Sequence, residues 1–388
     1  MTSEPLPWAR FDDLRAGSSS LLRADRGVLR ADTLDEVEPV LRAVQAAADE
    51  GRWAFGFVAY EAAPALDPAL ATQAGVDGLP LAWFGVADEP LAVPPITPRG
   101  GAGYAAGPWT CGWSRDRHAR AVDAVRARIA AGDTYQVNLT TMLTGPVAGD
   151  VAALYADLAG AQGGAHNTFL DTGRFAVAGA SPELFFAWGA GEVTMRPIKG
   201  TAPRGAAPAE DRALADELRT SSKERAENVM IVDLIRNDLA RIATEEGARV
   251  TALCEVETYP TVHQLVSEVT ARTRAGIGLV DVLRAVFPCG SVTGAPKAST
   301  MAIIRDLEAG PRGVYCGAVG LVAPPGSGTP TRFAVPIRTL VVDRERGTGT
   351  YGAGGGVTWG SRAGAEYDEL LVKARILPTT AEARSTAP

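Results

Sequence analysis

The chain has 388 residues, of which 46% are hydrophobic and 21% are charged, and its formal net charge at pH 7 is −7. This composition is typical of a globular protein that buries a core, and the negative charge argues against a nucleic-acid-binding surface. No apolar run reaches the roughly 18 residues that a membrane-spanning helix needs. We therefore expect no membrane as a partner and, because of the negative charge, no nucleic acid.

Cysteine usage and the N-terminus both favour a cytoplasmic protein. The N-terminal residues lack the basic start and the apolar core of a signal peptide. The cysteines are widely spaced with no C-x-x-C pair, which fits a reducing compartment and argues against a zinc site or a disulfide framework. They are Cys111, Cys254, Cys289 and Cys316.

Residues 1–105 are expected to form a looser N-terminal portion. It contains strand candidates at 53–60 and 81–86, and a linker rich in proline and glycine follows at about 90–108. Ser114 is the predicted N-cap of a helix that ends at Gly132, because apolar residues recur between them at helical spacing.

Strands and helices come in groups along the rest of the chain, which predicts an α+β fold with antiparallel sheets rather than a doubly wound nucleotide-binding fold. Strands at 175–180, 184–188 and 192–195 are expected to form a meander, and residues 379–388 a disordered tail. The other predicted strands lie within 132–140 and at 249–255, 264–270, 315–322, 333–342 and 348–357. The predicted helices after the first lie at 209–220, 222–243, 279–287, 298–307 and 363–376.

The segment Arg196–Arg204 presents a single lysine, Lys199, on a stiff and extended backbone. Prolines flank it at 197 and 203, and Gly200 leaves room for a group to approach the main chain. This arrangement suits a nucleophilic amine. A solvated lysine on a connector is the alternative, because most lysines are exposed.

Two pairs of glutamates, Glu224 with Glu227 and Glu366 with Glu369, lie three residues apart in predicted helices. This spacing puts each pair on one helix face. If the two faces meet, they form an all-oxygen site that suits Mg²⁺. The alternative for each pair is a solvated surface.

Four further features suggest ligand binding, each with a structural alternative. The glycine run at 352–357 and the segment Gly290–Lys297 expose backbone N–H groups, as a binding loop or simply as a turn and a capped helix start. Glu183, after an apolar strand, suits a proton donor or an ordinary turn carboxylate. Arg338, within the predicted strand 333–342, suits a bound carboxylate or a structural ion pair.

In this order, these pieces resemble the chorismate-utilising enzymes, a family that includes the anthranilate, aminodeoxychorismate, isochorismate and salicylate synthases. The resemblance runs from about Gly132 to Lys373 and is weak over residues 1–105. Its segments are GDTYQVNLT (132–140), GASPELFF (179–186), PIKGT (197–201), SKERAENVMIVDLIRNDLARI (222–242), TVHQLVSEV (261–269), FPCGSVTGAPK (287–297), VYCGAVG (314–320), IRTL (337–340) and AGGGVTWGS-x4-EYDELLVK (353–373).

The resemblance implies a single large α+β domain in which two antiparallel β-sheets pack as a sandwich with helices outside. Residues 106–378 would be the chorismate-binding catalytic portion. Residues 1–105 would pack on the same sandwich.

The resemblance also indicates the reaction. Lysine at position 199 is the mark of aminodeoxychorismate synthase component I, whereas anthranilate synthases carry alanine there. Isochorismate and salicylate synthases carry a water-activating lysine where this chain has Gln136, so direct attack by water is disfavoured. The implied product is 4-amino-4-deoxychorismate, for 4-aminobenzoate and folate or for an antibiotic pathway, and anthranilate synthase component I is the alternative.

Roles carried over from the family are expectations for this chain. Lys199 would attack the ring, Glu183 would protonate the departing hydroxyl, and His263 would lie beside the ring. Glu227, Glu366 and Glu369 would hold Mg²⁺, with Glu224 nearby. The implied substrate-binding residues are Gln136, Gly200, Thr201, Thr293, Tyr315, Arg338, Gly354, Gly355, Gly356 and Lys373.

Ammonia must reach this site from a donor. The chain shows no Gly-x-Cys-x-Gly nucleophile segment of a glutamine amidotransferase. In the family this task belongs to a separate small subunit, so the resemblance implies a heterodimer with a glutamine amidotransferase. A non-catalytic chorismate-binding subunit is a further alternative, but it would require loss of Lys199, Glu183 or a metal-binding glutamate, and all are present.

Overall fold

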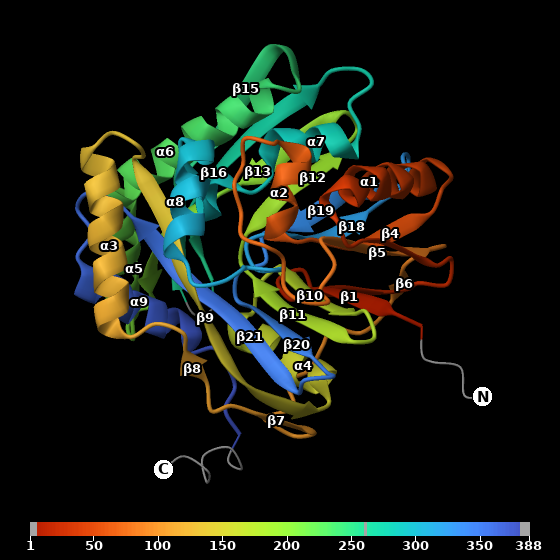
Figure 1. Cartoon of the computed structure of the whole chain (residues 1–388), viewed down its shortest axis with the longest axis horizontal. Helices are drawn as coiled ribbons and strands as arrows, with labels where there is room; N and C mark the ends of the chain where they lie inside the picture. Colours follow the sequence, from red (N-terminus) through yellow and green to blue (C-terminus); the bar gives the residue numbers. More distant parts are fainter. Residues whose placement is uncertain (1–5, 260–261, 381–388) are drawn as a thin grey trace.

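The computed structural model describes residues 6–259 and 262–380, so the predicted tail falls outside it from residue 381 onward. The described strands form one sheet of eleven strands and one of ten (Figure 1). Within these residues every strand pairing is antiparallel. The α+β class with two antiparallel sheets, predicted from the sequence, is confirmed.

The eleven-stranded sheet joins strands from both ends of the chain. Along its main path the order is β17 (Gly294–Ala295), β9 (Gln136–Gly149), β21 (Thr348–Val357), β20 (Thr339–Asp343), β11 (Phe175–Ser181), β10 (His166–Asp171), β1 (Trp8–Asp13), β2 (Ser18–Arg23) and β6 (Leu91–Ala92). Two short strands, β7 (Tyr104–Ala106) and β8 (Thr110–Cys111), also pair with β9.

The ten-stranded sheet is built in the same way. Its order is β14 (Ile198–Pro203), β16 (Val262–Thr273), β13 (Glu192–Arg196), β12 (Leu184–Gly189), β19 (Thr331–Ala334), β18 (Ala318–Val322), β4 (Trp53–Val58), β5 (Ala82–Ala87) and β3 (Val28–Ala31). The long strand β15 (Ala243–Thr258) pairs with β16.

Helices lie outside the sheets (Figure 1). They are α1 (Leu34–Asp49), α2 (Ala63–Leu66), α3 (Arg115–Ala130), α4 (Val151–Gln162), α5 (Pro208–Thr220), α6 (Ser222–Ala240), α7 (Leu279–Val286), α8 (Lys297–Leu307) and α9 (Ala363–Ala374), with 3-10 turns η1 (Tyr60–Ala62) and η2 (Gly290–Val292). As predicted, Ser114 caps α3, because its hydroxyl accepts from the backbone N–H of Arg117.

The sandwich follows from strands that are apolar on both faces. Successive side chains of a strand point to opposite faces. In β4, Phe55 and Phe57 therefore enter an apolar layer with residues of both sheets, while Ala54 and Val58 pack in the cluster that contains α1, α6 and α7. The other sheet packs its outer face against α4 and α9. The fold therefore consists of two packed sheets, each covered on its outer face by helices.

The expectation of a looser N-terminal portion is wrong. Residues 8–92 contribute β1, β2 and β6 to one sheet and β3, β4 and β5 to the other, and α1 covers the outside. A capping box at Thr33 and Glu36 begins α1 and was the signal available in the sequence. Similarly, Asp150 caps the unpredicted helix α4. The supposed linker also contains β6 and β7, which pair with β2 and β9.

Two predicted strand arrangements are also wrong, because the chain passes from one sheet to the other within each. The predicted meander is broken after Ser181, where β11 leaves the eleven-stranded sheet and β12 enters the other. The predicted strand 333–342 is two strands, β19 and β20, in different sheets. Pro336 lacks a backbone N–H for a ladder, and Arg338 has φ of +51°, so a continuous strand is impossible.

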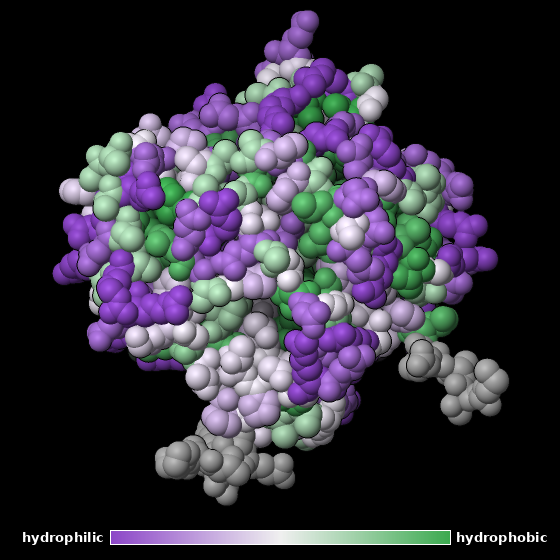
Figure 2. All heavy atoms as spheres, viewed as in Figure 1, coloured by the Kyte–Doolittle hydropathy of each residue, from purple (hydrophilic) through white to green (hydrophobic). Residues whose placement is uncertain are grey.

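On the face shown in Figure 2, hydrophilic residues are spread widely and hydrophobic residues show in smaller patches between them. Across the described part of the chain, no helix combines the length and the apolar character that crossing a bilayer requires.

Candidate active site

The two passages between the sheets run side by side. The backbone N–H of Val335 donates to the carbonyl of Glu183 at 3.1 Å, and that of Ala180 donates to the carbonyl of Arg338 at 3.0 Å. Ser181 closes the junction by donating its hydroxyl to the carbonyl of Val335 at 2.6 Å. Glu183 and Arg338, distant in sequence, therefore both lie at passages between the sheets.

Lys199 lies on β14, which pairs with β16 in the ten-stranded sheet. The pairing of β14 with β16 is irregular between Ile198 and Thr201, and such irregularities re-aim side chains. The Lys199 amine donates to the carbonyl of Ser291 at 3.0 Å. It therefore faces the turn η2 rather than solvent, although Thr201, two residues later, is exposed.

Gly200 is the point where α6 approaches this strand. Its φ is +92°, and a Cβ at this position would lie 3.0 Å from Oε2 of Glu224. The room that the sequence predicted beside Gly200 is thus occupied by a side chain of α6. A residue with a Cβ would also be strained at this φ.

Ser291 joins Lys199 to Glu183. While its carbonyl accepts from Lys199, its hydroxyl donates to Oε1 of Glu183 at 2.6 Å. Both Glu183 and Ser291 are buried. Ser291 lies in the segment Gly290–Lys297, which was expected to bind a ligand through its backbone N–H groups, but Ser291 was not among the predicted site residues. Only the folded chain shows that its hydroxyl binds the Glu183 carboxyl.

Burial moves the pKa values of this pair toward their neutral forms. It raises the pKa of the Glu183 carboxyl to about 7, against the opposing effects of the Ser291 hydroxyl and of Lys199. Burial also lowers the pKa of the Lys199 amine, although the carboxylates of Glu183 and Glu227 oppose this shift. A neutral acid beside a neutral amine is the combination that general acid and nucleophilic chemistry require.

The paired glutamates of α6 and α9 lie near each other and near Lys199. Burial raises the pKa of Glu227; Lys199 and Lys223 oppose this shift, while the negative charges of Glu224 and Glu366 reinforce it. Burial acts in the same sense on Glu369, but the ion pair with Lys373 outweighs it and lowers the pKa of Glu369. The Nζ of Lys373 lies 2.8 Å from Oε1 of Glu369.

These carboxylates fit a hard divalent cation by their chemistry. Like-charged oxygens of Glu227 and Glu366 are held close enough to raise the pKa of Glu227, and a cation would relieve that repulsion. In residues 6–259 and 262–380, however, no three His, Cys, Asp or Glu side chains form a preassembled metal cluster. A cation would therefore have to draw the two helix faces together or use ligand oxygens as well.

The glycine run forms the end of β21 rather than a loop. Gly354, Gly355 and Gly356 lie opposite Thr140, Leu139 and Asn138 of β9. The carbonyl of Gly354 accepts from Lys373 at 2.8 Å. A Cβ on Gly355 would meet the side chains of Lys373, Glu366 and Glu369 at 3.5–3.7 Å. The bare backbone of this strand therefore lies directly beside the carboxylates of α9.

Gln136 brings an unpaired amide to the same strand. Its side chain is buried, and among the described residues neither the amide nitrogen nor the amide oxygen has a hydrogen-bond partner. A Cβ on Gly356 would lie 2.6 Å from that nitrogen. Buried polar groups are normally satisfied, so a ligand lying along Gly356 would find an amide ready to bind it.

Arg338 carries a half-buried charge without a carboxylate partner in the described part of the chain. Its guanidinium donates to Oε1 of Gln162, and burial lowers the pKa of Arg338. A neutral amide does not compensate a desolvated cation, but a bound carboxylate would. Tyr315 lies in the same region, packed on Gly352. Burial raises the pKa of Tyr315 well above its usual value, so it stays a phenol.

Two residues carried over from the family make internal contacts instead. His263 lies on β16, and its ring nitrogens contact the hydroxyl of Thr258 at 3.0 Å and Oδ1 of Asp211 at 2.8 Å. The hydroxyl of Thr293 donates to the carbonyls of Cys289 and Gly290. His263 thus links β15 to α5 and Thr293 binds the backbone of its own turn, and within the described residues no hydrogen bond joins either side chain to Lys199 or Glu183.

The model of a family described as chorismate binding enzyme matches residues 97–378. An aminodeoxychorismate synthase of Streptomyces griseus is 45% identical over 269 residues, which cover 69% of this chain and 36% of the relative. Aminodeoxychorismate synthase component 1 of Klebsiella aerogenes is 40% identical over 68% of this chain and 58% of the relative. Anthranilate synthase component 1 of Streptomyces coelicolor is 40% identical over 70% and 52%.

The chain thus spans from about a third to three-fifths of the length of these relatives. Among solved structures, anthranilate synthase component I from Streptococcus pneumoniae superposes with a TM-score of 0.77 at 25% identity. That match covers 97% of this chain and 91% of the other.

Proposed function

We propose, because the chain belongs to the family of chorismate-binding enzymes, that it converts chorismate and ammonia to 4-amino-4-deoxychorismate. The observation that carries the proposal is that Lys199 and Glu183 are both hydrogen-bonded to Ser291. It puts an amine of lowered pKa beside a carboxyl whose pKa is raised to about 7. Anthranilate synthases, in the resemblance given above, carry alanine where Lys199 stands.

In the first proposed step the neutral amine of Lys199 attacks C2 of the chorismate ring. The ring double bonds shift and the C4–oxygen bond breaks. Glu183 gives its proton to the departing hydroxyl, which leaves as water, because hydroxide alone is a poor leaving group. The attacking nitrogen then loses one proton. The product is a covalent adduct on Lys199.

In the second proposed step ammonia attacks C4 of that adduct. The double bonds shift back and the bond between C2 and the Lys199 nitrogen breaks. The lysine leaves as an amine after taking back a proton, and the incoming nitrogen loses one. Overall, chorismate and ammonia give 4-amino-4-deoxychorismate and water. Two displacements place the nitrogen at C4, where the hydroxyl was.

The rest of the site would bind and orient the substrate. Arg338 would pair with a substrate carboxylate, which would compensate its half-buried charge. The Tyr315 phenol and the unpaired amide of Gln136 would donate hydrogen bonds. The bare backbone of Gly354–Gly356 would let the substrate lie against β21.

We further propose that the enzyme is Mg²⁺-dependent and that Glu227, Glu366 and Glu369 hold the metal ion, with Glu224 adjacent. The negative charges of Glu224 and Glu366, which add to the effect of burial in raising the pKa of Glu227, support the assignment. When bound, Mg²⁺ would supply positive charge that draws electron density toward a substrate carboxylate and makes the ring more electrophilic.

Ammonia would come from a separate glutamine amidotransferase subunit. Relatives from Klebsiella aerogenes and Escherichia coli are named component 1, which supports a separate second subunit.

A product assay tests the function directly. Chorismate, ammonium and Mg²⁺ should yield aminodeoxychorismate, with no release of pyruvate and no anthranilate fluorescence. Anthranilate synthase is the second candidate, because a relative of that name is 40% identical. Formation of anthranilate and pyruvate would establish that candidate and refute the proposal.

A further inference from the structure

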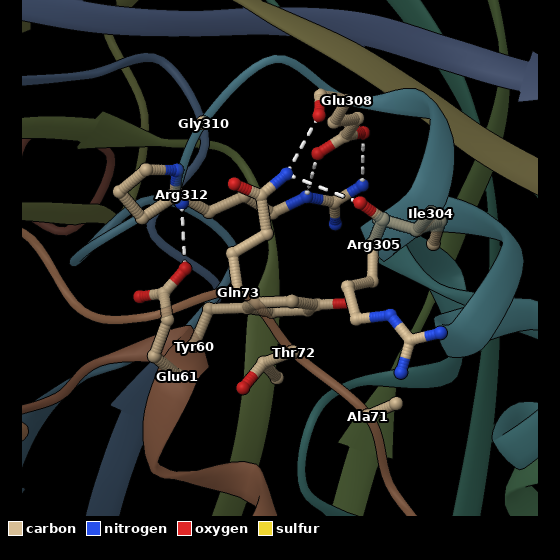
Figure 3. Close-up of a pocket in the computed structure, with 11 residues that line it drawn as sticks. Tyr60, Glu61, Ala71, Thr72, Gln73, Ile304, Arg305, Glu308, Gly310 and Arg312 are labelled. Carbon is tan, nitrogen blue, oxygen red and sulfur yellow. Dashed lines mark hydrogen bonds and ion pairs between the residues drawn. The ribbon is translucent and has the colours of Figure 1, made fainter.

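We propose that the buried ion pair of Glu308 and Arg312, together with Glu61, which accepts from the backbone N–H of Arg312, positions Ser291 for the reaction. This inference rests on the proposed function, because it assigns the network a role in the contact between Lys199 and Glu183. We call these three residues the Arg312 network. They lie outside the site described above, and Figure 3 shows Arg312 with Glu308 and Glu61 beside it.

Arg312 is fully enclosed and uses nearly all of its donors. Its Nε donates to Glu308 Oε2 at 2.9 Å, and its Nη2 donates to Glu308 Oε1 at 2.7 Å. The side chains of Arg312 and Glu308 are 1% and 5% exposed. The guanidinium also lies 4.6 Å from the centre of the Tyr60 ring. This bidentate, desolvated pair holds the guanidinium in one orientation.

The remaining donors of Arg312 bind two pieces of backbone that border the site. Its Nη1 donates to the carbonyl of Val292 at 2.8 Å, and its Nη2 donates to the carbonyl of Asn138 at 2.8 Å. Val292 directly follows Ser291 in η2, and Asn138 lies opposite Gly356 in β9. One cation therefore fixes the distance between the Ser291 turn and the strand beside the glycine run.

Glu308 ties the same network to β9 a second time. Its Oε1 accepts from the backbone N–H and the hydroxyl of Thr140 at 2.8 and 2.9 Å. Thr140 lies opposite Gly354. Glu61 anchors the other end, because it accepts from the backbone N–H groups of Arg312 and Gly313 at 2.6 and 2.9 Å. The N-terminal portion is thereby connected to the turn that carries Ser291.

The network does not itself form a ligand site. The cavity beside it, lined by Tyr60, Gln73 and Arg312 among others, has a volume of about 10 Å³. That is roughly the space of one water molecule. The charges therefore serve the protein's own backbone. A small displacement of Ser291 would weaken its bonds to Glu183 and Lys199 together, so Glu308 and Arg312 are positioning residues.

The test is Glu308→Gln, an isosteric change that removes the charge bound by Arg312. We expect kcat for aminodeoxychorismate to fall at least about tenfold, as misplacement of catalytic groups does, with little change in the KM for chorismate. Activity should fall at high pH as Glu183 loses its proton, and this alkaline limb of the pH profile should move to higher pH in the variant. The reason is that weakening the Ser291 bond removes a contact that lowers the pKa of Glu183. A purely structural role would leave that limb in place.

Asp343→Asn is the matched control, because it makes the same change in an ion pair with Arg174 at the far end of β20. It should keep the wild-type kcat and pH profile. Should Glu308→Gln not fold, Thr140→Val removes a single hydrogen bond to Glu308 and must lower kcat and shift the limb in the same direction.

A folded Glu308→Gln variant that behaves like Asp343→Asn would overturn the proposal, as would a lowered kcat with an unmoved alkaline limb. If Glu308→Gln does not fold, an unchanged Thr140→Val variant would overturn it as well. Failure of the wild type to make aminodeoxychorismate would instead refute the proposed function, so the two failures are distinguishable.

Discussion

The hydroxyl of Ser291 lies 2.6 Å from the carboxyl of Glu183, and it joins the turn before β17 to the passage between the two sheets. Because the Ser291 carbonyl also accepts from Lys199, both groups proposed for the chemistry are fixed to one residue. Small motions of that turn should therefore change proton donation and nucleophilic attack together.

Removing the Ser291 hydroxyl should move the pH dependence of the reaction. Glu183 must be protonated to act as an acid, so kcat/KM should fall as the pH rises through about 7. The hydroxyl stabilises the carboxylate form, so Ser291→Ala should raise the pKa of Glu183 and shift the alkaline limb to higher pH. Ser299→Ala, which removes a hydroxyl bonded to the Asp133 carbonyl, is the control. An unmoved limb in Ser291→Ala would contradict the contact.

Lys199 should carry a covalent adduct when chorismate is supplied without ammonia. Intact-mass measurement of the wild type should show the mass of chorismate less one water, and peptide mapping should place it on Lys199. Exposed Lys223 serves as the internal control for nonspecific modification. Lys199→Ala should form no aminodeoxychorismate. An active wild type with no adduct, or unchanged turnover in Lys199→Ala, would show that Lys199 is not the nucleophile.

Glu366→Gln should raise the Mg²⁺ concentration needed for half-maximal activity by at least about tenfold, because loss even of supporting residues around a metal costs that much. Asp368→Asn is the matched control: it lies on the same helix turn, but its side chain is 64% exposed and pairs with Arg115. Mg²⁺ titrations of both variants provide the measurement. Equal midpoints would remove Glu366 from the metal site.

Arg338→Met should weaken chorismate binding. Truncating one partner of a buried charge pair typically costs roughly 2–5 kcal/mol, so KM for chorismate should rise about 30-fold or more. Arg344→Met, which breaks an ion pair with Asp171 just beyond the other end of β20, should leave KM unchanged. Steady-state kinetics of both variants measure the KM for chorismate. Similar KM values for the two variants would show that Arg338 does not bind a substrate carboxylate.

Gly356→Ala should lower kcat/KM for chorismate by roughly tenfold or more, because its Cβ would lie 2.6 Å from the Gln136 amide and displace it. Gly360→Ala is the control, because a Cβ there meets nothing within 4 Å. Thermal unfolding of both variants separates a binding effect from lost stability. A Gly356→Ala enzyme with wild-type kinetics would show that the substrate does not lie along this strand.

The local elements were predictable wherever one periodicity or one cap dominates a segment. Ser114 at the start of α3 and the glutamate spacing on α6 and α9 are visible in the chain because helix geometry acts over three or four residues. By contrast, 333–342 reads as one apolar strand, and the passage at Arg338 depends on which sheet receives each half. Two buried sheets accept the same apolar residues, so hydrophobicity does not distinguish them.

By itself, the sequence determined which reactive groups the chain contains. They are Lys199 between two prolines, Glu183 after an apolar strand, and the two glutamate pairs. Only the tertiary structure decided that Lys199 and Glu183 share Ser291, that Gln136 faces Gly356 unpaired, and that Arg338 has no carboxylate partner among the described residues. The physical reason is burial. Desolvation and hydrogen bonding shift the pKa values, and both depend on which distant segments pack together.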